Sequence, residues 1–129
     1  MVGSLGNKIN YEFHPDGYII ATALRGVEIE AADLDTLLQA ARLRYNAPFG
    51  LLCNRVNDYL IDLAAYELIE TSEDLVAMAV VLYEGQSFPA ARLEAQYLRK
   101  TAYATFFSIE SAQHWMRERL AELEPPPGA

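Results

Sequence analysis

The residues with the clearest potential for chemistry form a short polar cluster: Asn54, Arg55, Asn57, Asp58 and Tyr59. The cluster follows an apolar run, Phe49 to Cys53, which is typical of a buried strand. Asp62, a few residues later, is a suitable N-cap for a helix. In an open α/β sheet the loop between such a strand and helix lies at the carboxyl edge, where ligands and partners usually bind. These residues are therefore the first candidate binding site.

The polar cluster has a functional and a structural interpretation. In the functional one, Arg55 takes an anionic group and Tyr59 offers an aromatic wall. In the structural one, Asn54 and Asn57 satisfy backbone groups of a turn, and Arg55 pairs with a nearby acid. The structural interpretation is favoured for any single residue, and binding is favoured for the loop as a whole, because loops at this edge carry function.

A second group follows the next apolar run. Tyr83, Gln86 and Ser87 should lie beside the first loop and, with Arg25, can line one groove. The structural alternative is that Ser87 caps a helix and that Tyr83 is half-buried. The candidate partner- or ligand-binding residues are therefore Asn54, Arg55, Asn57, Asp58, Tyr59, Tyr83 and Ser87.

Other reactive residue types have simpler explanations. Glu110, His114 and Glu118 share one face of a helix, as metal ligands can, but a solvated face is expected. Cys53 ends an apolar strand and is expected to be a buried, inert thiol. The acid pairs Glu28/Glu30 and Asp33/Asp35 flank a helix start, where carboxylates complement the helix dipole. The isolated glycines fit no phosphate-binding loop. We therefore expect no catalytic site, no metal and no cofactor.

The elements that must position these residues follow from hydrophobic periodicity. Alternation predicts a hairpin of two strands, and an uninterrupted apolar run from Leu75 to Tyr83 predicts a central strand buried on both faces. Asp33, Asp62, Ser87 and Ser108 are the expected helix caps. The expected strands are Ile9–His14, Tyr18–Leu24, Phe49–Cys53, Leu75–Tyr83 and Tyr103–Phe107. The first two expected helices cover Leu34–Tyr45 and Leu63–Glu70. The third expected helix has a buried stripe of Phe88, Ala91, Ala95 and Leu98, and the last has an inner face of Ala112, Trp115, Met116, Leu120 and Leu123.

This order, β-β-α-β-α-β-α-β-α, predicts an α/β fold with a single mixed, mostly parallel five-stranded sheet and four helices. A chain of 129 residues, 52% of them hydrophobic, is the size of one domain with a real core. We expect one domain over residues 1–129, with a loose start at 1–7 and a Pro-rich tail at 125–129.

Charge and hydropathy restrict the partners. The net charge of −8 opposes binding to nucleic acid and anionic lipid, and it permits a basic partner. The longest apolar run has nine residues, whereas a membrane span needs about 20. The start of the chain lacks the features of a signal peptide, so cytoplasmic residence is expected.

Three stretches of the chain are similar to the STAS domain of bacterial anti-sigma-factor antagonists. They are Asn54–Tyr59 followed by Ile61–Asp62, the strand Val76–Val81, and Phe106–Ala112 with Trp115. The chain most closely resembles the SpoIIAA-like (STAS/SEC14-type) family of small stand-alone bacterial proteins.

The resemblance implies a non-catalytic domain that binds a partner protein or a second copy of itself. The alternative is a carrier of a small apolar ligand or a nucleotide. In the antagonists, a Ser at the start of the second helix is phosphorylated and switches partner binding. The matching segment here, Asn54 to Asp62, has no Ser or Thr, so that switch does not carry over. Asp58 places a fixed negative charge about where the phosphate would lie, with less charge and fewer acceptors.

Overall fold

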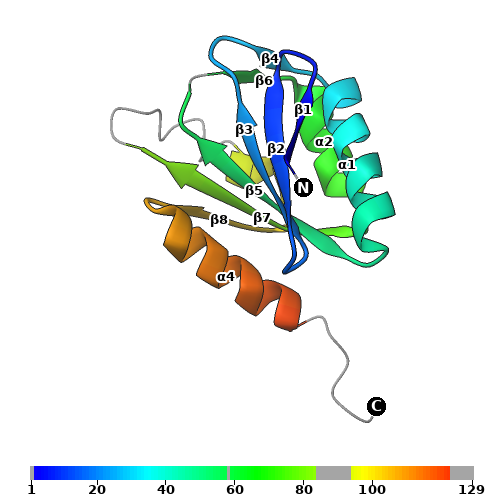
Figure 1. Ribbon diagram of the computed structural model, residues 1–129, viewed down its shortest axis with the longest axis vertical. Helices are drawn as coiled ribbons and strands as arrows, with labels where there is room; N and C mark the ends of the chain where they lie inside the picture. Colours follow the sequence, from blue (N-terminus) through cyan, green and yellow to red (C-terminus); the bar gives the residue numbers. More distant parts are fainter. Residues whose placement is uncertain (1, 58, 84–93, 123–129) are drawn as a thin grey trace.

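The alternating and continuous apolar segments of the chain assemble into one main sheet. The computed structural model describes residues 2–57, 59–83 and 94–122. The main sheet has six strands: β1 (Val2–Leu5), β2 (Ile9–His14), β3 (Tyr18–Ala23), β5 (Phe49–Arg55), β7 (Leu75–Leu82) and β8 (Ala102–Phe106). Their order across the sheet is β1-β2-β3-β5-β7-β8 (Figure 1). β1, β2 and β3 pair antiparallel, and β3, β5, β7 and β8 pair parallel. The predicted mixed sheet is confirmed, with one strand more than expected.

The extra strand corrects the prediction of a loose start at residues 1–7. Val2–Leu5 pairs antiparallel with β2, from Val2 opposite Glu12 to Leu5 opposite Ile9. Gly3 lies against the ring of Tyr11, where a Cβ atom would collide with that ring. Gly6, at φ +56°, makes the turn into β2. A four-residue strand with polar and small residues is too short to show a period, and backbone pairing forms it.

A second, two-stranded sheet was also absent from the prediction. It pairs β4 (Glu28–Ile29) with β6 (Leu60–Ile61) in parallel. Two residues show no periodicity, so the sequence gives no local signal for either strand. The pair joins the segment after β3 to the segment after β5, which contains the polar cluster.

The described helices are α1 (Ala31–Tyr45), α2 (Leu63–Thr71) and α4 (Ile109–Ala121), and residues 94–97 are also helical. α1 begins earlier than predicted: its N-cap is Glu30, and Asp33 accepts the Glu30 N–H at 2.9 Å from the third helical position. α2 begins after Asp62, as predicted. Ser108 caps α4 as predicted, because its Oγ accepts the Ser111 N–H. Residues 125–129 and the cap predicted at Ser87 lie outside the described residues.

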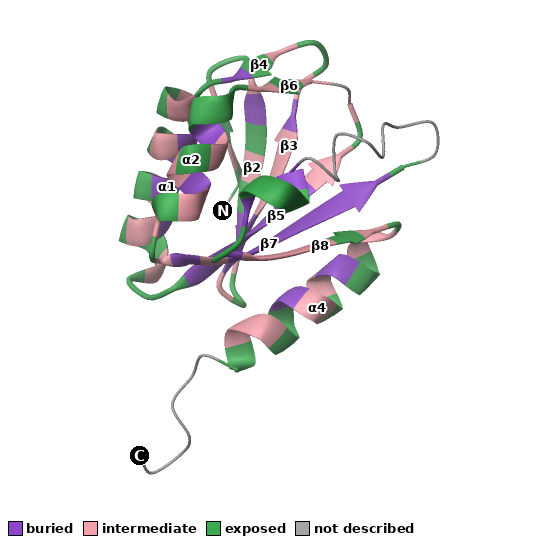
Figure 2. Ribbon diagram, turned by 180° about the vertical axis from the view of Figure 1, so that it is seen from behind, coloured by how far each residue is buried: buried purple, intermediate pink, exposed green. Residues whose placement is uncertain are grey.

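The helices enclose the sheet from both sides, with α1 and α2 on one face and α4 on the other (Figure 1). β7 is buried along almost its whole length (Figure 2), which confirms the predicted burial on both faces. The strand was expected at the centre of the sheet, but it lies next to the edge strand β8. α4 lies close to β5 because Gly50 has no side chain where Met116 packs. Within the described part of the chain, no helix combines the length and the apolar character needed to cross a membrane.

Candidate functional site

The carboxyl ends of β3, β5 and β7 lie at one edge of the sheet, as the parallel order requires. β5 continues two residues beyond the predicted end at Cys53, so Asn54 and Arg55 belong to the strand. Asn54 faces Tyr83, whose hydroxyl donates to its side-chain oxygen. The structure therefore brings together two residues that the sequence placed in neighbouring loops. Arg25 is exposed in the turn after β3. Asp58, Gln86 and Ser87 lie outside the described residues.

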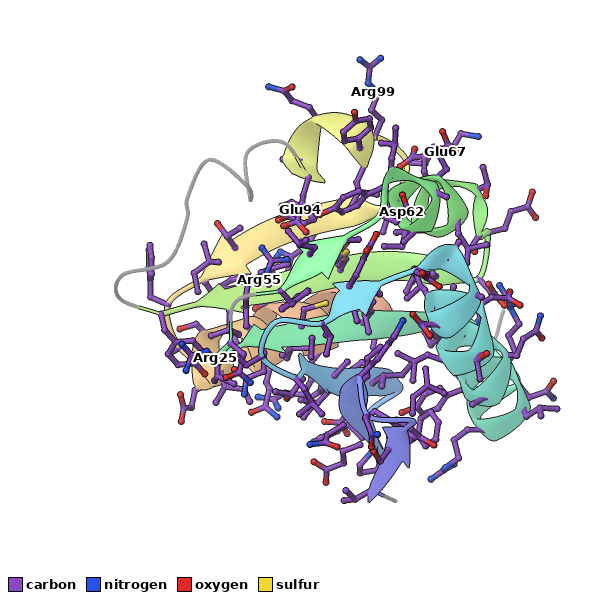
Figure 3. All side chains as sticks on the ribbon, turned by 90° about the horizontal axis from the view of Figure 1, so that it is seen from above. Arg25, Arg55, Asp62, Glu67, Glu94 and Arg99 are labelled. Carbon is purple, nitrogen blue, oxygen red and sulfur yellow. The ribbon has the colours of Figure 1, made fainter. Side chains whose placement is uncertain are left out.

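Arg55 is the centre of a buried polar network. Its two terminal nitrogens donate to the two carboxylate oxygens of Glu94, at 2.9 and 2.7 Å (Figure 3). The carboxylate also accepts hydrogen bonds from the hydroxyls of Tyr66, at 2.6 Å, and Tyr103, at 3.0 Å. The Glu94 side chain is 1% exposed and that of Arg55 is 11% exposed. This network joins α2, β5, β8 and the helical residues 94–97.

Burial and the Glu94 charge set the protonation of this network. Burial raises the pKa of Tyr66 and of Tyr103, and the nearby carboxylate raises each further. Burial opposes the charged form of Arg55, but its hydrogen bonds to Glu94 raise its pKa overall. The guanidinium is therefore charged, and both phenols remain hydrogen-bond donors across the ordinary pH range. A carboxylate held by four donors is a structural centre.

Glu94, Tyr66 and Tyr103 were not predicted as partners of Arg55. Ala95 was expected in the buried stripe of the third helix, whereas Ala95 is exposed and Glu94 is buried. Phe88 and Ala91, from the same predicted stripe, lie outside the described residues. One signal was present: Glu94 is four residues before Leu98, which was correctly predicted to be buried, so both lie on the same face of a helix.

The other polar residues of the cluster also bond within the chain. The Asn57 side chain donates to the Ala23 carbonyl at 3.1 Å and so ties the loop to the end of β3. The Tyr59 ring lies 5.2 Å from the Arg55 guanidinium, and its hydroxyl accepts from Arg55 Nε at 3.2 Å. Each of these contacts holds the loop against the sheet edge.

The apolar residues of the same segment point outward instead. Val56 is 46% exposed, Leu60 is 69% exposed and Leu63 is 48% exposed. Ile61, next to Leu60 in β6, packs into the core, as alternation along a strand requires. In the described part of the segment from Val56 to Leu63, which we call the Val56–Leu63 surface, the half-buried side chains of Asn57 and Tyr59 thus turn inward, and Val56, Leu60 and Leu63 are exposed. Exposed apolar residues grouped in this way are unusual for a solvated loop.

An apolar cavity of about 50 Å³ lies beneath the sheet face that α1 and α2 cover. It is lined by residues of the core, together with Cys53 and Tyr59. Burial raises the pKa of the Cys53 thiol to about 12, so the thiol is protonated and unreactive. The predicted burial of Cys53 is confirmed, and its inertness stays a prediction.

The possible metal stripe on α4 is exposed. His114 Nε2 lies 2.8 Å from a Glu118 carboxylate oxygen, with 70% and 56% of the two side chains exposed. Among the described residues, no group of three or more His, Cys, Asp or Glu side chains is placed to hold a metal ion. On the inner face of the same helix, Ala112 and Met116 are buried, and Trp115 and Leu120 pack against them half-buried. Leu123 lies outside the described residues.

This arrangement of strands and helices is the SpoIIAA-like fold. A solved structure with the same arrangement is that of an uncharacterised protein of the DUF3478 family from Shewanella loihica PV-4, which is described as having a SpoIIAA-like fold. The similarity covers 84% of this chain and 91% of that one, with a TM-score of 0.54 and 19% sequence identity. At this identity the likeness concerns the fold. No family model matches the sequence, and no curated protein matches it.

Proposed function

We propose that this chain is a non-catalytic, STAS-like protein-binding domain whose partner docks on the Val56–Leu63 surface. The observation that carries the proposal is the reversal of polarity in this segment. Asn57 and Tyr59 bond inward, and Val56, Leu60 and Leu63 are presented to solvent. Exposed apolar side chains grouped in one segment are typical of protein interaction sites.

The polar residues of the cluster hold the Val56–Leu63 surface in place. Arg55, held by Glu94, fixes the end of β5, and Asn57 fixes the loop that follows. A surface already held in its binding conformation loses less entropy on association. Asn54 and Tyr83, hydrogen-bonded to each other at the same sheet edge, extend the proposed contact area. Asp58 and Ser87 belong to the same proposed surface by their place in the sequence.

The energetics favour a protein partner with further contacts. Burying a leucine completely is worth about 1.5–3 kcal/mol. Scaled by their exposure, Leu60 and Leu63 together with Val56 supply roughly 2–5 kcal/mol. A micromolar complex needs about 8 kcal/mol, so the partner must also contact residues around the Val56–Leu63 surface.

We place this interaction in the cytoplasm, where a chain with one buried thiol needs no oxidising surroundings. Because Asn54–Asp62 lacks Ser and Thr, we expect no phosphorylation switch within this loop.

Photo-cross-linking in cells of the source organism tests this proposal. A photo-reactive amino acid replaces Leu60 in one variant and Leu43 in a control variant. Leu43 lies on α1 and is 88% exposed, so both positions present an exposed leucine. We expect a discrete adduct from position 60 and none from position 43. A homodimeric adduct identifies the partner as a second copy, and light scattering of the purified chain then gives its oligomeric state. Equal labelling at both positions, or none at position 60, would contradict the proposal.

The cavity supports a second candidate, a carrier of a small apolar ligand. The cavity is apolar and lies between sheet and helices, as a carrier requires. Its volume of about 50 Å³ is well below the roughly 150 Å³ that accommodates benzene in an engineered core cavity. Loading therefore requires α1 or α2 to move. A lipid or other apolar molecule retained in native mass spectrometry would favour this candidate, and a mass equal to that of the bare chain would count against it.

A further inference from the structure

A groove of about 220 Å³ lies where α2 meets the helical residues 94–97. It is lined by Tyr66, Glu67, Glu70, Thr71 and Tyr97. Sites for whole small-molecule ligands usually measure about 300–1,000 Å³, so this groove fits a single side chain better than a cofactor. Glu67 and Glu70 follow Leu63 by four and seven residues, which places all three on one face of α2. The groove therefore continues the Val56–Leu63 surface along the helix.

Two tyrosines form the aromatic wall of the groove. The rings of Tyr66 and Tyr97 are stacked, with centroids 5.8 Å apart and an interplanar angle of 5°. The Tyr66 hydroxyl is fixed by Glu94 at 2.6 Å, so the stack rests on the buried network. Tyr97 remains 49% exposed. An exposed tyrosine face attracts cations through its quadrupole.

Two carboxylates supply negative charge at the same groove. Glu70 accepts the backbone N–H groups of Arg99 and Lys100, at 2.8 and 2.6 Å, and thereby holds the segment after Tyr97 against α2. Glu67 is exposed, and no described side chain forms an ion pair or hydrogen bond with its carboxylate. The Arg99 side chain extends outward above residues 94–97 and away from Glu67 (Figure 3). Among the described residues, no lysine or arginine side chain therefore forms an ion pair with Glu67.

From this geometry we infer that the groove receives a lysine or arginine side chain from a basic segment of the partner. The cation lies against the exposed part of the Tyr97 ring and pairs with Glu67, while the apolar residues of that segment contact Leu63 and Leu60. The net charge of −8 favours such a partner at longer range. The inference rests on the proposed protein-binding function and names the chemistry of the partner.

NMR titration with short peptides tests the groove separately from the Val56–Leu63 surface. The probes are acetyl-Gly-Lys-Gly-amide, its arginine counterpart, and a norleucine peptide that has the same shape without charge. We expect the two cationic peptides to shift the amide signals of residues 66–71 and 97–100, and the norleucine peptide to leave them unchanged. Glu67→Gln should weaken binding about two- to fivefold, and Tyr97→Leu by a similar factor.

The control is Glu110→Gln, which removes the same charge from an exposed position on α4, on the other face of the sheet. It should leave binding within the error of the measurement. Equal shifts with norleucine, or equal losses in Glu67→Gln and Glu110→Gln, would overturn the inference. Leu60→Asp should leave peptide binding intact. If the cationic peptides bind but position 60 gives no cross-link, the proposed function is wrong and the inferred cation site in the groove is supported. If position 60 gives a cross-link but the peptides do not bind, only the inferred cation site is wrong.

Discussion

Replacing Glu94 by glutamine tests the role of the buried network most sharply. Glu94→Gln keeps the shape of the side chain and removes its charge. Arg55, 11% exposed, is then left as a buried cation without a counter-ion. The hydroxyls of Tyr66 and Tyr103 donate to different carboxylate oxygens, so only one of them can still donate to the amide oxygen, and the other meets the amide NH2 group. The largest effect is the uncompensated guanidinium.

The size of the loss follows from burial. Breaking a buried ion pair by removing one partner costs about 3–5 kcal/mol. A domain of this size has a free energy of unfolding of about 5–15 kcal/mol, so Glu94→Gln should remove a large fraction of it. The double variant Arg55→Met/Glu94→Leu leaves no buried charge and so removes that cost. Tyr66 and Tyr103 are then left without their acceptor, at about 1–3 kcal/mol for each hydroxyl and roughly 2–6 kcal/mol together, so the double variant should remain clearly less stable than the wild type.

Urea denaturation followed by circular dichroism measures these differences. The control is Arg42→Met, which breaks another ion pair in which Nε and a terminal nitrogen contact one carboxylate, that of Asp74. Those side chains are 31% and 33% exposed, so solvent screening limits the loss to about 0.2–1 kcal/mol. If Glu94→Gln costs no more than Arg42→Met, or if the double variant is as stable as the wild type, the assignment of the network as a structural centre is wrong.

Three further predictions concern the core and the surface. Gly50→Ala should lower the free energy of unfolding by about 1–3 kcal/mol, because its Cβ collides with Met116 and forces α4 outward; near-ultraviolet circular dichroism of Trp115 should change with it. Cys53 should react with a thiol reagent about a thousandfold more slowly in the native chain than in urea at pH 8, because its pKa is about 12 rather than about 8.5; equal rates would show an open thiol. The hydrogen bond from Arg42 holds the pKa of Asp74 below 3.8, so the folded chain binds fewer protons there than the unfolded chain. The stability that Asp74 contributes is complete above that value and is lost as the pH falls, so Asp74→Asn should lose less stability than the wild type between about pH 5 and 2; identical acid unfolding curves would exclude this.

The long strands were predictable because their apolar residues alternate or run without interruption. β2, β3, β7 and β8 follow the predicted segments within a residue or two at their ends. β1, β4 and β6 were not predictable, because they have two to four residues and form through backbone pairing with distant segments. Because these strands were not predicted, the start of the chain was expected to be loose, and the segment after β5 was expected to be a loop.

The described residues of the polar cluster lie at the predicted edge of the sheet, but the direction of their side chains was not predicted. The prediction ended β5 at Cys53. With the strand continued to Arg55, alternation places Leu51, Cys53 and Arg55 on the same, helix-covered face. Glu94 is 39 residues further along the chain, and no local pattern pairs it with Arg55. The exposure of Val56, Leu60 and Leu63 accompanies the inward direction of the Arg55 side chain, and it could be recognised only in the folded chain.

The most direct test of the protein-binding role uses the partner identified by cross-linking at position 60. Titration calorimetry compares its affinity for the wild type, for Leu60→Ala and for Leu43→Ala. Removing Leu60 should weaken binding about tenfold, in line with the loss of roughly 1–2 kcal/mol of apolar burial, while Leu43→Ala should bind as the wild type does. Unchanged affinity in Leu60→Ala, or an equal loss in both variants, would contradict the assignment of the Val56–Leu63 surface as the docking site.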